Sequence, residues 1–174
     1  AKLTRKASNA AFLARYRMNQ LRYLNKIPPV SPLGRRILEE LDADGVSVTQ
    51  LEDLRLAANA SLLKTLVGVD RELDSAELKR EALEYKGGFE HCVPINPSRI
   101  ATEYPDLFMW GLDGVLLDIV KNCIGLPPAY HGVVVRKEIV DGKLAGTRLW
   151  HVDSEDLNII RVMIYLSDVL DDEA

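Results

Sequence analysis

Apolar side chains recur every three or four positions through most of the chain, which is the spacing of one face of an α-helix. In the first run they are Leu3, Ala7, Ala10, Ala11, Ala14, Met18, Leu21 and Tyr23. The basic side chains of the same run are expected on the opposite face. The pattern predicts helices over residues 3–24, 31–41, 49–67, 74–85 and 105–125.

Residues typical of helix ends support these boundaries. Thr49 with Glu52, and Asp74 with Glu77, have the spacing of a capping box, in which each side chain bonds the other residue's backbone. Pro105 suits a first helical turn, and Gly125 suits a helix end. The proline-rich, polar stretch over residues 92–98 is predicted to be a loop.

After residue 125 the period changes from about 3.6 to 2, which is typical of β-strands. Residues 132–140 and 147–153 alternate around Asp141-Gly142, a dipeptide that favours a hairpin turn. The β-branched and aromatic run over residues 158–166 predicts a further strand. We therefore expect helices over 37–125 followed by strands over 132–169.

The charge is divided unevenly along the chain. Of 174 residues, 22 are basic and 26 acidic, for a net charge of −4. Nine basic residues precede the first acid, Glu39: Lys2, Arg5, Lys6, Arg15, Arg17, Arg22, Lys26, Arg35 and Arg36. This predicts a basic helical arm over residues 1–36 and an acidic body over residues 37–174, and it argues against a general nucleic-acid-binding protein.

Three further features narrow the class of protein. With 47% hydrophobic residues the chain contains enough apolar material for one core, and no stretch is long and uncharged enough for a membrane span. Cys92 and Cys123 lack CxxC pairing, as expected for reduced thiols in a cytoplasmic protein. No secretory signal is present at the start of the given sequence.

The candidate chemistry lies at Trp150-His151-Val152-Asp153. On an extended strand His151 and Asp153 share one face, so one imidazole and one carboxylate would stand side by side. They supply two of the three ligands of the facial site that holds non-haem Fe(II). By itself the tripeptide also fits a strand-end histidine followed by a turn at Asp153.

Two motifs together resemble the phytanoyl-CoA dioxygenase family of Fe(II)/2-oxoglutarate oxygenases. They are W-H-V-D at 150–153 and Y-L-S-D-V at 165–169, and L-D-A-D-G-V-S-V at 41–48 agrees more loosely with the start of that family's domain. The resemblance implies an α+β fold with a mainly β core, in which N-terminal helices pack on a double-stranded β-helix. It also implies that His151 and Asp153 bind Fe(II), with 2-oxoglutarate and O2 as cosubstrates.

The resemblance further implies hydroxylation of a small-molecule metabolite, with release of succinate and CO2. The family's third metal ligand and its 2-oxoglutarate-binding arginine come later than Ala174, so neither is present in this chain. We expect an incomplete barrel, as in a fragment of a longer oxygenase, with weak turnover by this chain alone. The alternative is a non-catalytic homologue that acts as a binding or scaffold domain.

Other residues near the motif have two possible roles. Tyr165 could donate a hydrogen bond to the cosubstrate and Arg161 could pair with a loop acid, although packing explains both equally well. Arg148 is expected at the surface, and Leu149 in the pocket lining. His131 is expected to be structural. His91 with Cys92 lacks the four-ligand spacing of a zinc site.

The basic arm also has alternative partners. It could pack on the acidic body of its own chain, or dock on an acidic partner, a phosphate-bearing substrate or a neighbouring subunit. The last of these would produce a homo-oligomer through the arm.

Overall fold

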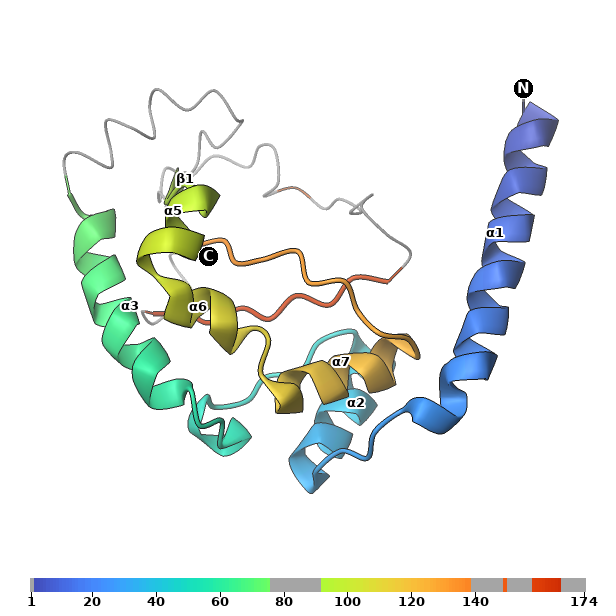
Figure 1. Ribbon diagram of the computed structural model, residues 1–174, viewed down its shortest axis with the longest axis horizontal. Helices are drawn as coiled ribbons and strands as arrows, with labels where there is room; N and C mark the ends of the chain where they lie inside the picture. The colour runs from blue at the N-terminus through green and yellow to red at the C-terminus, as the bar shows by residue number, and fades with distance from the viewer. Residues whose placement is uncertain (1, 76–91, 139–148, 150–157, 167–174) are drawn as a thin grey trace. The chain divides into compact units, whose positions relative to one another are not determined.

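The computed structural model describes residues 2–75, 92–138, 149 and 158–166, and side chains from residue 10 onward (Figure 1). Its elements are, in order, α1 (Lys2–Tyr23), η1 (Leu24–Lys26), α2 (Pro32–Asp44), η2 (Glu52–Leu54), α3 (Asn59–Leu73), β1 (Cys92–Pro94), α5 (Pro97–Glu103), α6 (Pro105–Trp110), α7 (Gly114–Ile124) and β2 (Arg136–Glu138). The chain folds as two compact units. Unit 1 comprises Ala1–Leu56 with Leu112–Tyr130, and unit 2 comprises Ala57–Gly111 with His131–Ala174.

In unit 1, α2 packs against α7 (Figure 1). The Ser31 hydroxyl caps α2 by accepting a hydrogen bond from the Gly34 N–H at 3.1 Å, and Gly45 ends the helix in the left-handed conformation at φ 74°. Gly34 is buried at the helix contact. A Cβ there would lie 3.3 Å from Ile119 Cγ1, so glycine permits the two helices to approach closely.

The face of α1 that contacts its own unit is not the predicted apolar face. The half-buried side chains are Tyr16, Asn19, Gln20 and Tyr23, which form one stripe at helical spacing. Ala14, Met18 and Leu21 are exposed, and Leu21 is 73% exposed. The helix is confirmed, but the expected separation of an apolar face from a basic face is wrong in this part of it, because Arg15, Arg17 and Arg22 lie on the same exposed side as Ala14, Met18 and Leu21.

In unit 2, α3 lies beside α6, and α5 leads directly into α6 (Figure 1). The buried stripe of α3 consists of Leu62, Leu66, Val69 and Leu73. Ile100 of α5 and Leu107 and Trp110 of α6 are also buried. This apolar core supports the small sheet, in which Cys92 and Val93 are buried as well.

The sheet pairs two distant segments. β1 and β2 are antiparallel, with Cys92 opposite Glu138 and Pro94 opposite Arg136. The Ile95 N–H donates to the Val135 carbonyl at 2.9 Å, which extends the pairing by one step. Residues 136–138 thus confirm part of the strand predicted over 132–140, whereas β1 occupies a stretch predicted to be a loop.

Several predicted helices differ in their ends. The helix expected over 49–67 is instead the short η2, a break at Arg55 in the left-handed conformation (φ 51°), and then α3. The helix expected over 105–125 is divided into α6 and α7, because Asp113 caps a new helix through the Val115 N–H at 2.8 Å. The helix expected over 74–85 falls almost entirely outside the described residues, and Asp74 itself is the C-cap of α3.

The predicted fold class is wrong. Within the described residues the chain is mostly helical, with one sheet of two short strands. These residues do not form the predicted α+β fold with a mainly β core and a double-stranded β-helix. The run over 158–166 forms neither helix nor strand. Its β-branched side chains suit a strand, but they cannot specify which chain segment would pair with it.

The described helices include none that is both long and apolar enough to cross a membrane. The proposed division into an arm over 1–36 and a body over 37–174 stays a prediction.

Candidate metal centre

The two predicted metal ligands, His151 and Asp153, lie outside the described residues, as do His91 and Arg148. The structure describes the segments on either side of the pair: β2 before it, Leu149, and residues 158–166 after it. These segments all belong to unit 2.

β2 is attached to the rest of unit 2 by a side-chain pair and by backbone pairing. The Lys137 ammonium contacts the Asp74 carboxylate at the end of α3 at 2.6 Å. This hydrogen-bonded pairing raises the pKa of Lys137. Val135 is buried and its carbonyl accepts from Ile95. The segment that leads toward the predicted ligands therefore starts from a fixed position on α3 and β1.

A charged cluster joins α3 to α5. The Arg99 guanidinium contacts Glu103 at 2.7 Å and Glu72 at 2.6 Å. The Tyr104 hydroxyl donates to the second carboxylate oxygen of Glu72. Two helices are thus connected through one carboxylate, Glu72, that accepts from both an arginine and a tyrosine.

The cluster shifts the pKa values of its members. The hydrogen bond to Glu103, and then those to Glu72, raise the pKa of Arg99, and the same bond lowers the pKa of Glu103. The hydrogen bond to Glu72, with burial, raises the pKa of Tyr104 to about 12. Because Arg99 is already paired with two carboxylates of its own chain, the cluster is suited to holding helices together rather than to binding an anion.

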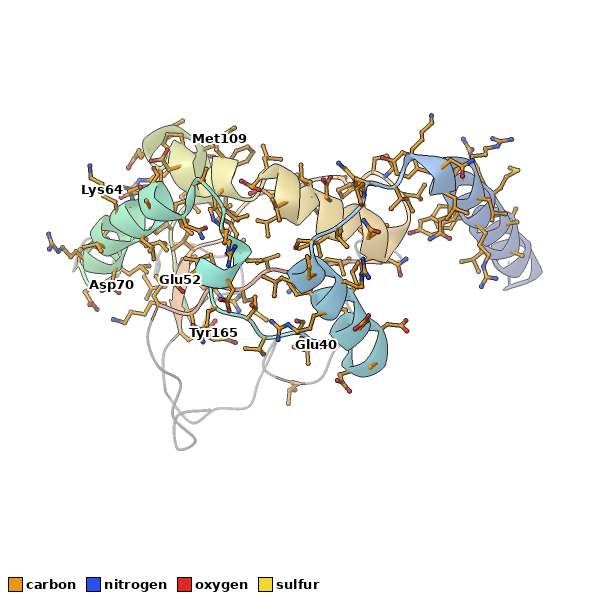
Figure 2. All side chains as sticks on the ribbon, turned by 90° about the horizontal axis from the view of Figure 1, so that it is seen from below. Glu40, Glu52, Lys64, Asp70, Met109 and Tyr165 are labelled. Atoms are coloured by element: carbon orange, nitrogen blue, oxygen red, sulfur yellow. The ribbon has the colours of Figure 1, made fainter. Side chains whose placement is uncertain are left out.

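A second set of polar contacts joins α3 to α6. The Ser61 hydroxyl donates to Asp106 at 2.6 Å, and the Trp110 indole donates to Asn59 at 2.9 Å. Lys64 and Asp70 lie on the exposed part of α3 (Figure 2). Buried Trp110 has its N–H satisfied, so these contacts fix the register of the two helices.

Tyr165 is the one predicted site residue that the structure describes. Its side chain is 70% exposed (Figure 2). Met163, two positions away, is exposed as well, whereas Ile160 and Ile164 are half-buried. The side of this segment that carries Arg161, Met163 and Tyr165 is therefore the more exposed one. A role of Tyr165 in binding the cosubstrate stays a prediction.

Among the described residues, no three His, Cys, Asp or Glu side chains come together in a group that could hold a metal ion. His131 is exposed at the start of the segment that leads to β2, and Cys92 is buried in β1. A candidate metal site therefore rests on the donor chemistry of His151 and Asp153. Imidazole nitrogen and carboxylate oxygen fit Fe(II), and they are two of the three protein ligands that a facial site requires.

The Glu72 cluster was missed in the sequence. One local signal is present, because Arg99 and Glu103 are four positions apart and can pair on one helix. The contributions of Glu72 and Asp106 depend on how α3 packs, which the local pattern does not show.

Comparison with known protein families, with curated proteins and with solved structures finds no match to this chain. The resemblance seen at 150–153 and 165–169 is therefore carried by those residues themselves.

Proposed function

We propose that this chain contributes His151 and Asp153 to the metal site of an Fe(II)/2-oxoglutarate-dependent dioxygenase that hydroxylates a small metabolite. The observation that carries this is the pair of motifs W-H-V-D at 150–153 and Y-L-S-D-V at 165–169, in that order and at that spacing. A two-residue ligand pair needs only an extended segment, in which the side chains at 151 and 153 share a face.

The ligand pair suits the reaction in its chemistry. His151 would bind through an imidazole nitrogen and Asp153 through a carboxylate oxygen, which leaves positions for a chelating 2-oxo acid. When bound, Fe(II) and 2-oxoglutarate supply the activation of O2 that hydroxylates a C–H bond and releases succinate and CO2. The third ligand and the partner of the 2-oxoglutarate 5-carboxylate would come from residues outside this chain.

The chain before the pair is anchored within the described part of unit 2. The Lys137–Asp74 pair and the pairing of β1 with β2 hold the chain 13 positions before His151 at Glu138.

An anaerobic titration with Fe(II) and 2-oxoglutarate tests the proposal, with the metal-to-ligand charge-transfer absorption band as the readout. We expect the band in the unmodified chain, and its loss in His151→Ala and in Asp153→Ala. His131→Ala is the matched control and should keep the band. Tyr165→Phe should keep it as well, with weaker 2-oxoglutarate affinity if the phenol donates to the cosubstrate.

Two results would overturn the proposal. A band that survives both ligand substitutions would place the metal elsewhere. A complete absence of the band at millimolar Fe(II) and 2-oxoglutarate would show that His151 and Asp153 of this chain do not hold the metal.

A further inference from the structure

α1 has one face that is not used by its own chain. The stripe Tyr16, Asn19, Gln20 and Tyr23 is half-buried against unit 1. The outer face of α1, which we define as Ala14, Arg15, Arg17, Met18, Leu21 and Arg22, is exposed. Leu21 is 73% and Met18 45% exposed.

The charges of this outer face are unmatched. α1 has no acidic residue, since the first acid of the chain is Glu39. Arg15, Arg17 and Arg22 form no ion pair with any residue that the structure describes. In the described contacts, the arm pairs with an acid of the body at Arg36, which contacts Glu40, whereas these three arginines of α1 do not.

The same unit has a complementary surface at the end of α2. We define the acidic end of α2 as Glu39, Glu40, Asp42 and Asp44, four carboxylates within the last six residues of the helix. Glu40 is paired with Arg36 at 3.3 Å. The other three are exposed and form no ion pair within the described part of the chain.

The acidic end of α2 is electrostatically unfavourable by itself. A helix C-terminus carries partial negative charge, and cationic side chains normally stabilise it. The last turn of α2 has no basic residue. Beyond it, Val46 and Val48 are 60% and 79% exposed. This surface therefore combines unneutralised negative charge with exposed apolar side chains, as the outer face of α1 combines positive charge with Met18 and Leu21.

We propose that the outer face of α1 docks on the acidic end of α2 of a second copy of this chain, and that the reciprocal contact forms at the same time. A symmetric dimer results in which each copy supplies one basic and one acidic surface. Charge complementarity favours docking of α1 on α2, because a dimer that paired two α1 helices would bring like charges together. An anionic lipid surface fits less well, since the outer face of α1 carries two large apolar side chains, Met18 and Leu21, and the exposed Phe12 and Leu13 of the same helix are not part of that face.

The experiment is a charge exchange followed by sedimentation equilibrium. The arm variant is Arg15→Glu with Arg22→Glu, and the patch variant is Asp42→Lys with Asp44→Lys. We expect the unmodified chain to dimerise, with a dissociation constant that rises about tenfold or more between 50 and 500 mM NaCl. Each variant alone should be monomeric, because its two surfaces then carry like charge.

Two recombinations distinguish docking from damage to the fold. An equimolar mixture of the arm and patch variants should form heterodimers, and a chain carrying all four substitutions should recover self-association. Loss of dimerisation through unfolding would not be reversed in either case. The matched control, Lys64→Glu with Asp70→Lys on the exposed part of α3, should dimerise like the unmodified chain.

Three outcomes would overturn the proposal. The first is an unmodified chain that stays monomeric at 50 mM NaCl and high micromolar concentration. The second is dimerisation that persists in both variants. The third is a monomer that sediments with vesicles containing phosphatidylserine but not with neutral vesicles, which would make lipid the occupant of the outer face of α1.

Discussion

The side-chain amide of Gln20 donates a hydrogen bond to the backbone carbonyl of Ile124, across 2.7 Å and 104 positions of sequence. Ile124 is the last residue of α7, where backbone carbonyls have no partner within the helix. Gln20 supplies that partner from α1. One amide therefore caps one helix and fixes the position of another.

The first prediction concerns this contact. Gln20→Ala leaves the Ile124 carbonyl without its donor in a half-buried site, so we expect the free energy of unfolding to fall by about 1–2 kcal/mol. Urea denaturation followed by far-UV circular dichroism measures it. Asn25→Ala, at an exposed position in η1, is the control and should change the value by less than about 0.5 kcal/mol. Equal effects from both variants would show that the Gln20 bond contributes nothing.

A second prediction compares two glycines. Gly125 ends α7 at φ 73°, and a Cβ there would lie 3.2 Å from the Gln20 amide nitrogen. Gly125→Ala should lower the free energy of unfolding by about 1–2 kcal/mol, because an L side chain is strained in this conformation. At Gly68, within α3, an added Cβ would have no neighbouring atom within 4 Å. Gly68→Ala should therefore raise stability by about 0.5–1 kcal/mol. Thermal melting of both variants decides the sign.

The third prediction is a pH dependence that arises at Tyr104. Its hydrogen bond to Glu72 raises its pKa to about 12, from 10. Between these values the unfolded chain has lost the proton and the folded chain retains it. The stabilising contribution is therefore complete below pH 10 and is lost as the pH rises toward 12.

Urea midpoints at pH 9 and pH 11 test this dependence. The charged groups around the phenol are Glu72, Arg99 and Glu103. The unmodified protein should lose more stability over this range than Tyr104→Phe, which cannot titrate at this position. Parallel pH profiles for the two proteins would contradict the assignment of the shift to Tyr104.

The fourth prediction separates the two thiols. Cys92 is buried and Cys123 is exposed. With a disulfide-exchange reagent, we expect one thiol to react in the folded protein and the second only after unfolding, and Cys123→Ser should remove the first. Partial burial, and then the Asp42 carboxylate, raise the pKa of Cys123. Asp42→Asn should increase its reaction rate at pH 8 by about twofold, whereas Asp44→Asn should leave the rate nearly unchanged.

Local sequence signals predict the parts of the fold that depend on neighbouring residues. Ser31 and Gly45 mark the ends of α2, and Gly125 marks the end of α7, because caps act within one turn. The Asn96-Pro97 start of α5 has an equally local signal that was overlooked: the Asn96 side-chain carbonyl oxygen accepts from the Ser98 N–H at 2.9 Å.

Other features depend on contacts between distant residues. The Thr49-x-x-Glu52 pattern predicts a cap, but the Thr49 hydroxyl instead accepts from Arg36 at 3.2 Å, and the turn after Glu52 ends at Arg55. The pairing of β1 with β2 joins segments more than 40 positions apart. In the candidate site, the ligand pair was predicted from two sequence motifs. The contacts of Glu72 could not be predicted in this way, because they depend on how α3 packs.

The two units are interleaved along the chain, since unit 1 is made of Ala1–Leu56 and Leu112–Tyr130. This arrangement affects how the protein is synthesised. Gln20 bonds the carbonyl of Ile124, which lies 104 positions later in the sequence. At a synthesis rate of about 5–20 residues per second, Gln20 therefore leaves the ribosome roughly 5–20 s before Ile124 does. During that interval the basic arm has none of its native contacts with α7. Until α7 has been made, the Gln20 amide of the nascent chain lacks the carbonyl that it bonds in the folded protein.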